Sequence, residues 1–333
     1  MSAVENRPVD PDEAGMRLDR WFKLHFPGLG FGQLQKLLRS GQIRVDGGRV
    51  KSDTRLAKDQ IVRLPPMVTG LAASGKNRKP HMTAATIRDR SDADVLNDMM
   101  LYQDKKVFVF NKPAGLAVQG GSGVSRHIDM MMESIRNQKG EKPRLVHRLD
   151  RDTSGVLVVA RTRGAAAELT KSFRHRDTEK IYWAVCRGVP KKREGRISTW
   201  LVKERTEDGD RMRVAHHGEP DADHAETVYE VLETAGQNLS WVKLSPITGR
   251  THQLRVHTAS IGNPIIGDPK YFDVENWEFP GGIQKRLHLH ARQIRIPHPD
   301  GGMIDVSAPL PPHMEQTFNL LAFDQGSAGE DNA

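Results

Sequence analysis

Residues 66–86 contain proline, glycine, serine, asparagine and lysine, and their apolar residues follow neither a helical nor a strand period. A segment of this kind cannot bury a continuous apolar face, and its composition is typical of a linker. It divides a chain of 333 residues, a length that allows about two domains. We therefore expect a loose N-terminus over residues 1–15, a small domain over 16–65, a larger domain over 87–322 and a polar tail over 323–333.

The small domain has the pattern of a compact α/β module. Leu18, Trp21, Phe22 and His25 recur at helical spacing until Pro27 and Gly28 interrupt the pattern. A second helix is predicted over residues 32–39, followed by alternating residues at 43–45, a turn at 46–47 and a returning strand from Val50. The apolar run at 61–64 predicts a last strand.

The larger domain is predicted to be rich in strands. Apolar runs at residues 107–110 and 155–159 are typical of buried strands, and alternation over 181–186 favours a strand buried on one face. Residues 238–244 predict a further strand, and 251–261 a helix with Thr251 near its N-cap. The fold class expected for the larger domain is α+β.

The charge of the chain favours a polyanionic partner. The net charge is +8, and residues 1–80 contain 15 Lys and Arg against 8 Asp and Glu, so almost all of the excess lies in the N-terminal quarter. This distribution suits nucleic acid, although a solvated basic face would have the same composition.

Several classes of protein fit the sequence poorly. No run of about 18 apolar residues exists to span a membrane, and the acidic first twenty residues lack the apolar core of a secretory signal. The single cysteine, Cys186, excludes an internal disulfide and a cysteine-cluster zinc site. We expect a cytoplasmic protein without a metal or cofactor.

The densest cluster of chemically active side chains is the run HRLDRDTSG at residues 147–155, directly before a predicted buried strand. Two carboxylates, two guanidinium groups and an imidazole are costly to bury without partners. The run is either a salt-bridged surface turn or a site in which cations keep a carboxylate ionised as a nucleophile or base. Asp150 and Asp152 also resemble a glycosidase pair, but two residues in one turn do not control the separation that such a pair needs.

A second cluster covers residues 248–257, with the sequence TGRTHQLRVH. On a helix, His252 and Arg255 share a face and Leu254 lies on another. Groups near the start of the helix could receive a phosphate, or the segment could be an ordinary helix with exposed bases. His252 and His257 diverge on a helix and lack an accompanying carboxylate, so a metal site is not expected.

Together and in this order, these segments resemble the RluA-type family of pseudouridine synthases. The motifs lie within about residues 100–315: residues 111–115 (NKPAG), the run at 147–155, Lys180 with Tyr182, residues 248–257, 267–271 (GDPKY) and 289–291 (LHA). Residues 16–65 resemble the S4 RNA-binding module, above all the stretch RSGQIRVDG at 39–47. Residues 117–123 are similar to the large-subunit rRNA synthase C group, which usually has histidine where this chain has Gln119.

The resemblance implies a mixed or antiparallel catalytic sheet and the isomerisation of uridine to pseudouridine in large-subunit ribosomal RNA, with no cofactor. It implies Asp150 as nucleophile or base, Arg255 as the cation beside it and Tyr182 as the aromatic side chain that contacts the base. Arg148 is expected to occupy the space that the extruded uridine leaves. Further RNA contacts are expected at Lys36, Arg39, Arg44, Lys51, Lys112 and Arg250, and the protein is expected to be a monomer.

Three alternatives remain open from the residues. A synthase of the same family could act on tRNA. A non-catalytic RNA-binding or ribosome-assembly protein would bind RNA and leave its uridines unchanged. A glycoside hydrolase would act on sugars and ignore RNA.

Overall fold

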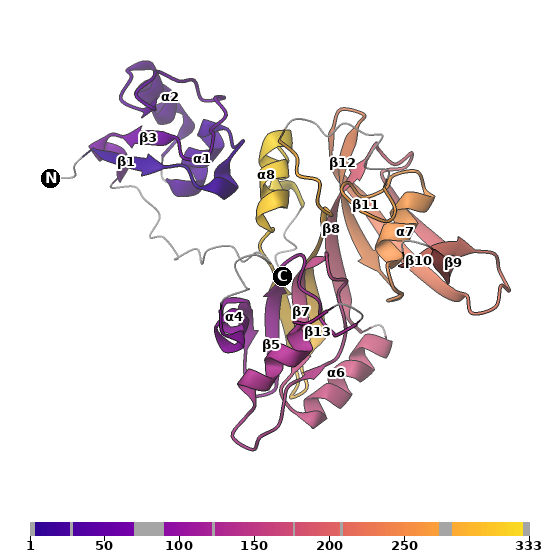
Figure 1. Cartoon of the computed structure of the whole chain (residues 1–333). Helices are drawn as coiled ribbons and strands as arrows, with labels where there is room; N and C mark the ends of the chain where they lie inside the picture. Colours follow the sequence, from indigo (N-terminus) through magenta and orange to yellow (C-terminus); the bar gives the residue numbers. More distant parts are fainter. Residues whose placement is uncertain are drawn as a thin grey trace. The chain divides into compact units, whose positions relative to one another are not determined.

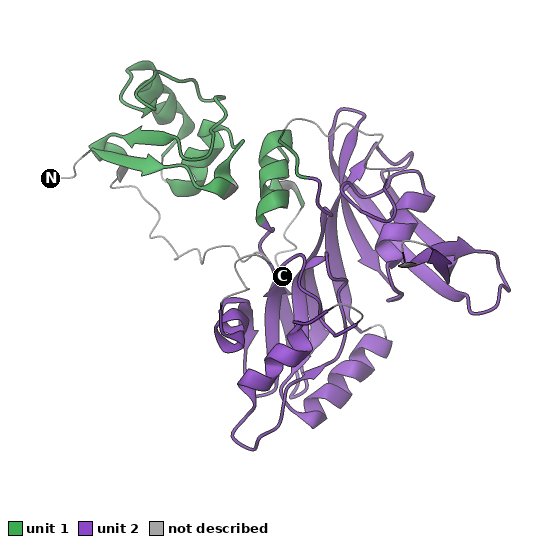
Figure 2. Cartoon of the chain, in the orientation of Figure 1, with its two compact units in different colours: residues 1–80, 279–284, 312–333 green, residues 81–278, 285–311 purple. Residues whose placement is uncertain are grey.

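The computed structural model describes residues 4–26, 29–69, 90–121, 124–175, 177–206, 209–272 and 282–328. The chain divides into two compact units, which Figure 2 distinguishes by colour. Unit 1 comprises residues 1–80, 279–284 and 312–333, and unit 2 comprises residues 81–278 and 285–311. The C-terminal residues 312–322, which the sequence grouped with the larger domain, thus belong with the N-terminal module.

Unit 1 is a small antiparallel sheet packed with short helices. The sheet has the strand order β1-β3-β2. Its core includes Trp21 and Phe22 of α1, Leu37 and Leu38 of α2, and Val62 of β3. The elements are β1 (Glu5–Pro8), η1 (Pro11–Glu13), α1 (Leu18–His25), α2 (Phe31–Arg39), β2 (Arg44–Val45), β3 (Ile61–Leu64), α3 (Pro66–Thr69), α8 (Pro312–Leu321) and η3 (Gln325–Ala328).

The helices predicted near residues 18–25 and 32–39 are confirmed, and two other expectations for this region are wrong. The N-terminus is not loose, because β1 pairs with β3 and Glu13 is buried. No strand begins at Val50, since residues 49–54 form no strand and the chain between the turn at Asp46 and β3 pairs only through isolated bridges at Gly48 and Arg55. Of the expected linker, residues 66–69 form α3 and residues 70–86 lie outside the described residues.

Unit 2 is built on an eleven-stranded mixed sheet (Figure 1). Nine strands follow the order β10-β9-β11-β12-β8-β13-β7-β5-β4, while β14 pairs with β13 and β6 with β7. Only the pairing of β13 with β7 is parallel among the described strands. The strands are β4 (Met100–Gln103), β5 (Val107–Lys112), β6 (Arg144–Leu145), β7 (Ser154–Ala160), β8 (Glu179–Arg187), β9 (Glu194–Thr206), β10 (Gly209–Ala215), β11 (Asp223–Ala235), β12 (Leu239–Pro246), β13 (Leu289–Pro297) and β14 (Met303–Ser307).

Helices cover both faces of the sheet around β5 and β7. Val107 and Val109 pack with α6 on one face, while Phe108 and Phe110 pack with α4 and α5 on the other. This alternation explains why the strand reads as an uninterrupted apolar run. The helical elements of unit 2 are α4 (Asp92–Asp98), α5 (Ile128–Met131), η2 (Met132–Ile135), α6 (Arg163–His175) and α7 (Gln253–Ser260).

The predicted strands at 107–110, 155–159, 181–186 and 238–244 are confirmed as parts of β5, β7, β8 and β12. The expectation that β8 is buried on one face is wrong, because it lies between β12 and β13 and residues 183–186 are all buried. The helix predicted over 251–261 is confirmed as α7, and Thr251 lies directly before its N-cap residue, His252. No helix among the described residues is long and apolar enough to cross a membrane.

Candidate active site

A cavity of about 1000 Å³ opens in unit 2 where the β6–β7 loop, β8 and the start of α7 meet. Asp150, Tyr182, Arg255, Arg148 and Arg250 all line it, so the structure brings these five predicted residues together. They come from segments that are up to 107 positions apart in the chain (148 to 255). The cavity is therefore a product of the fold rather than of one motif.

Asp150 lies in the loop that leads into β7. The preceding residue, Leu149, is 7% exposed and packs in the core between the sheet and α5, so it anchors the loop. The carbonyl of Arg151 accepts hydrogen bonds from Lys112 Nζ and from the Gly115 amide, both at 2.9 Å. Anchors on both sides of Asp150 therefore fix the position of its backbone at the cavity.

A close approach of β7 to β13 follows directly after this loop. Gly155 has a φ of +110°, and a Cβ there would lie 2.1 Å from the carbonyl oxygen of Ala291. Only glycine can occupy this position without moving β13. The glycine at the end of the HRLDRDTSG run thus lets the strand beneath the active site close against its parallel neighbour.

Arg255, on α7, is an almost buried cation with two carboxylate neighbours. Its Nε and Nη2 donate to the two oxygens of Asp268 at 2.7 Å, and its Nη1 lies 3.4 Å from Asp150 Oδ2. Burial opposes the charge, but the hydrogen bonds and charge of Asp268, and then the charge of Asp150, raise the pKa of Arg255 above its usual range. Arg255 is a permanent positive charge beside Asp150.

Tyr182, on β8, contributes an aromatic ring to the cavity wall. It packs against the apolar clusters on both sides of the active site. Burial raises the pKa of Tyr182, and the negative charge of Asp150 raises it further. The side chain is therefore a neutral phenol whose ring can contact a base.

The charges that line the cavity are strongly unequal. Among the described residues, Asp150 is the only carboxylate in the lining, and Asp152 does not line it. The cationic side chains in the lining are Arg148, Arg151, Arg174, Lys180, Arg250 and Arg255. This composition suits a polyanionic substrate and does not provide the paired carboxylates of a glycosidase.

Arg148 and Arg250 are exposed side chains in the cavity lining. Arg148 makes a long hydrogen bond, and Arg250 makes contacts that are open to solvent. Arg148 Nη1 donates to Gln119 Oε1 at 3.3 Å. Arg250 forms an ion pair with Asp223 at 3.2 Å and donates to the carbonyl of His224. Both guanidinium groups are therefore exposed in the lining of the cavity.

The expectation that Lys112 contacts RNA is wrong. Lys112 is fully buried, and its Nζ donates to the carbonyl oxygens of Pro113, Leu116 and Arg151 at 2.9–3.0 Å. Burial lowers its pKa to about 7, against the opposing charges of Asp152 and Asp150. With all three ammonium hydrogens directed at backbone carbonyls, Lys112 holds the turn after β5 against the loop of Asp150.

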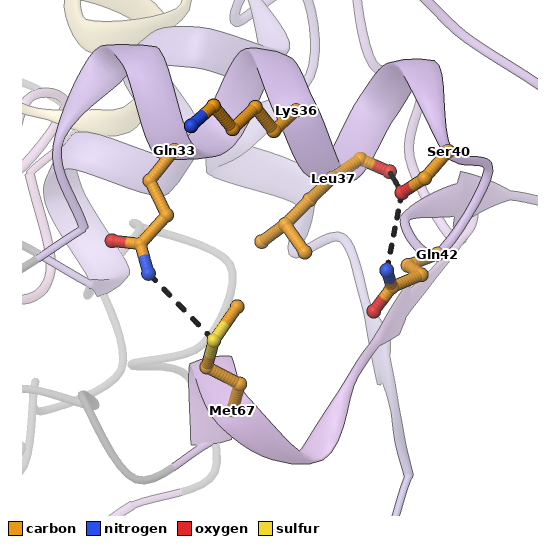
Figure 3. Close-up of a pocket in the computed structure, with 6 residues that line it drawn as sticks. All are labelled: Gln33, Lys36, Leu37, Ser40, Gln42 and Met67. Carbon is orange, nitrogen blue, oxygen red and sulfur yellow. Dashed lines mark hydrogen bonds between the residues drawn. The ribbon is translucent and has the colours of Figure 1, made fainter.

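The predicted RNA contacts of the N-terminal module lie on unit 1. Lys36, Arg39 and Lys51 are exposed, while Arg44 is partly buried and donates to the carbonyls of Gly41 and Gly47. A hollow of about 550 Å³ lies beside Lys36 (Figure 3). Its lining comes from α2, the following loop and α3, namely Gln33, Lys36, Leu37, Ser40, Gln42 and Met67.

Three residues around Asp150 have no role assigned from the sequence. Asp268, which lies within the GDPKY motif, accepts two hydrogen bonds from Arg255. His252 lines the cavity 3.9 Å from Asp150, and its place beside Arg255 on one helix face was the available signal. Lys180 lines the cavity without an ion pair to another described residue, and burial lowers its pKa.

No group of three or more His, Cys, Asp and Glu side chains suitable for a metal ion occurs in the part of the chain that the structure describes.

Comparison with known proteins identifies the family. Residues 106–260 match the family model described as RNA pseudouridylate synthase. The chain is 35% identical to the ribosomal large subunit pseudouridine synthase C of Pasteurella multocida, over 98% of this chain and 96% of that protein. It is 36% identical to the protein of the same name from Haemophilus ducreyi, over 94% of each chain.

A solved structure agrees with this result. The human RNA pseudouridylate synthase domain containing protein 4 is similar with a TM-score of 0.57 and 32% identity, over 68% of this chain and 95% of that one. The chain described here belongs to the RNA pseudouridylate synthase family and is an RNA pseudouridine synthase, an isomerase.

Proposed function

We propose that this enzyme isomerises uridines to pseudouridine in large-subunit ribosomal RNA, with Asp150 as the catalytic carboxylate. In this reaction the glycosidic bond from the ring nitrogen to the sugar breaks, and a carbon–carbon bond from the ring to the same sugar carbon forms. The ring carbon that joins the sugar loses its proton, and the freed ring nitrogen gains one. The observation that carries the proposal is that, among the described residues, Asp150 is the single carboxylate in a cavity whose other charged side chains are all cations. The printed names of the relatives, which span nearly the whole chain, support the ribosomal substrate.

The roles of the other groups follow from their placement. Arg255 Nη1 lies 3.4 Å from Asp150 Oδ2 and places a permanent positive charge beside the catalytic carboxylate. The ring of Tyr182 contacts the uracil, and its neutral phenol is a hydrogen-bond donor next to Asp150. An ionised carboxylate could attack the uracil ring, attack the anomeric carbon or remove a sugar proton.

The substrate uridine has to leave its base stack to reach this cavity. Extrusion costs a few kcal/mol and favours loops or weakly paired sites. Arg148 is exposed at the cavity and held only by a 3.3 Å contact with Gln119, so it can turn into the space that the uridine leaves. Arg250 and Lys180 line the same cavity and are placed to bind the flanking phosphates.

Unit 1 is proposed to be an S4-like RNA-binding module, and unit 2 to hold the chemistry. Two helices on a small antiparallel sheet and three exposed cations, Lys36, Arg39 and Lys51, support this assignment. A separate basic module extends the RNA footprint beyond the cavity, which itself needs only one extruded base. Such an enzyme reads RNA shape, so several loops of similar form could be modified.

The catalytic proposal is tested with Asp150→Asn in the purified chain, with Asp152→Asn as the matched control from the same loop. We expect Asp150→Asn to abolish conversion of uridine while RNA binding stays within about twofold, because an amide is neither a useful nucleophile nor a base. Asp152→Asn should keep most of the activity. If Asp150→Asn retains a tenth of the wild-type rate, Asp150 is not the catalytic group.

The substrate is tested by mapping pseudouridine in rRNA and tRNA of cells that lack the gene, followed by complementation with wild type and Asp150→Asn. Loss at several large-subunit rRNA positions, restored by wild type alone, is the expected result. Loss confined to tRNA would assign the enzyme to the alternative substrate. RNA binding without any lost modification would favour an assembly protein.

A further inference from the structure

The two oxygens of the Asp150 carboxylate have different surroundings. Oδ2 lies 3.4 Å from Arg255 Nη1 and 3.9 Å from His252 Nε2. Among the described residues, the one hydrogen bond to the Asp150 carboxylate goes to Oδ2, and none reaches Oδ1. Two potential donors therefore converge on one oxygen and leave the other open.

His252 has a left-handed backbone conformation, which is uncommon for residues other than glycine. It is the N-cap of α7 with φ 52° and ψ 17°, in the left-handed region, and its side chain does not cap the helix. Such a conformation is strained for a residue with a side chain and persists only where the surroundings enforce it. Here it places the imidazole in the cavity wall, between Asp150 and Tyr271.

The turn that enforces this conformation is held by Gln253. The side-chain oxygen of Gln253 accepts from Thr248 Oγ1 at 2.7 Å and from the Arg250 amide at 3.0 Å. Its side-chain nitrogen donates to the Glu226 carbonyl and to Thr227 Oγ1, both at 2.9 Å. Gln253 is itself almost fully buried, so the chain on both sides of His252 is fixed.

Tyr271 determines which ring nitrogen of His252 carries the proton. The phenol oxygen accepts from the Met212 amide at 2.8 Å and lies 2.8 Å from His252 Nδ1. Burial raises the pKa of Tyr271, so the phenol is protonated, and its hydrogen has Nδ1 of His252 as an acceptor within hydrogen-bond distance. A neutral imidazole that accepts at Nδ1 carries its own hydrogen on Nε2, the nitrogen that faces Asp150.

Burial favours the neutral form of the His252 ring, although its charged neighbours act in both directions. Burial is the largest influence and lowers its pKa, and the cations Arg255 and Lys270 lower it further. Asp150 and Asp268 oppose this change without reversing it. His252 therefore offers a hydrogen-bond donor to Asp150 without adding a second full positive charge.

We propose that His252, held by Tyr271, is a positioning residue that joins Arg255 in holding Oδ2 of Asp150 and leaves Oδ1 as the oxygen that meets the uridine. The inference rests on the proposed role of Asp150. The 3.9 Å separation closes on substrate binding or is bridged by one water, as catalytic hydrogen bonds in unliganded enzymes often are. Held in this way, the carboxylate cannot rotate to present both oxygens to the substrate.

The first test concerns the proton position and does not depend on activity. The full-length chain is labelled with ¹⁵N at histidine, and the His252 signals are assigned by their loss in His252→Asn, a residue type that tolerates the left-handed conformation. Shifts of the neutral tautomer with hydrogen on Nε2 at pH 7 are the expected result. A neutral tautomer with hydrogen on Nδ1, or a charged ring at that pH, would overturn the proposal.

The second test measures single-turnover rates on a saturating RNA substrate. Tyr271→Phe removes the phenol but keeps the ring against Arg255, and His252→Asn removes the donor. Each should lower the rate by about 10- to 100-fold, the usual effect of losing a hydrogen bond to a charged group. RNA affinity should change less than twofold. His252→Gln, which places an amide donor near the position of Nε2, should recover part of the rate.

The outcomes separate this proposal from the proposed function. Equal rate losses in His252→Asn and His252→Gln, or losses matched by weaker RNA binding, would mean that His252 is merely structural. Wild-type rates in Tyr271→Phe and His252→Asn would also reject the positioning role while leaving Asp150 in place. Failure of Asp150 itself is detected by the Asp150→Asn experiment.

Discussion

Arg255 gives two of its nitrogens to Asp268 and only one to Asp150. Nε and Nη2 each lie 2.7 Å from a separate oxygen of Asp268, whereas Nη1 lies 3.4 Å from Asp150 Oδ2. Asp268 is fully buried and accepts further hydrogen bonds from the Lys270 and Tyr271 amides. The firm partner of the arginine is thus the buried carboxylate, which keeps Arg255 in place and leaves Asp150 free to react.

This arrangement predicts that Asp268→Asn harms both stability and catalysis. The substitution leaves a nearly buried guanidinium group without its strong partner, and breaking such a pair typically costs about 3–5 kcal/mol. Arg255 should then move toward Asp150 and occupy the reactive carboxylate. We expect lower urea resistance and a reduced single-turnover rate. Asp305→Asn, on the exposed side of β14, should change stability by less than about 0.5 kcal/mol.

Gly155 is predicted to tolerate no side chain. The Cβ of Gly155→Ala would lie 2.1 Å from the Ala291 carbonyl oxygen, in a backbone conformation with φ +110°. We expect a loss of at least about 3 kcal/mol in urea unfolding, since both strain and backbone displacement contribute. The matched control is Gly164→Ala on α6, where nothing lies within 4 Å of the new Cβ. That change should stabilise the protein by about 0.5–1 kcal/mol, and equal effects at the two positions would contradict the prediction.

Three fully buried histidines predict a loss of stability in mild acid. Burial lowers the pKa of His257 and His288 from 6.5 to about 4, and that of His290 to about 3. The folded state therefore binds fewer protons than the unfolded state between these values and 6.5. Stability is complete above about pH 6.5 and falls as the pH drops below it, by about 1.4 kcal/mol per pH unit for each histidine.

Urea unfolding between pH 7.5 and 4.5 measures this dependence. His257→Asn should reduce the slope by close to one proton, whereas His216→Asn, at an exposed position, should leave it unchanged. Constant stability from pH 7 to pH 5 would mean that the three rings take up protons in the folded state as readily as in the unfolded state, which would contradict the prediction. Loss of activity in the same range would need to be separated from unfolding by near-ultraviolet circular dichroism.

Local pattern was enough to predict the central strands and the loop of Asp150. Residues 107–110 and 155–159 are apolar on both faces because helices cover both sides of the sheet, and such runs are visible without a structure. The long strands β9 and β11 were not predicted, because many of their residues are partly exposed and polar and therefore lack a continuous apolar run. The two strands pair with each other, so their formation depends on that pairing rather than on the local strand preference of either segment.

The missed parts of the active site depend on contacts between distant segments. Asp268 meets Arg255 across the loop that follows α7, and nothing in the spacing of the two residues indicates a bidentate pair. The left-handed conformation of His252 depends on the buried contacts of Gln253 with β11. Lys112 looks like a surface cation in the sequence, and only the fold shows that backbone carbonyls surround it.

The last prediction tests whether the exposed cations of unit 1 contribute to RNA binding without contributing to the chemical step. Substituting glutamine for Lys36, Arg39 and Lys51 removes three exposed cations from unit 1. Deletion of the module is a poorer test, because the C-terminal segment of the same unit depends on it: Arg55 donates to the Asn319 carbonyl and Arg20 to the Phe323 carbonyl. The triple variant leaves these hydrogen bonds intact.

We expect the triple variant to bind RNA more weakly and with a shallower salt dependence, by about 0.7–0.9 in the logarithmic slope for each phosphate that the protein no longer neutralises. Its single-turnover rate at saturating RNA should equal that of the wild type, since Asp150, Tyr182 and Arg255 all belong to unit 2.

The control variant carries glutamine at Lys139, Lys191 and Lys192, which are exposed on unit 2, and has the same net charge. If both triple variants lower the slope equally, the effect is one of net charge, and the module has no special contact with phosphates. A lower rate at saturation in the unit 1 variant would show that the module also contributes to the chemical step.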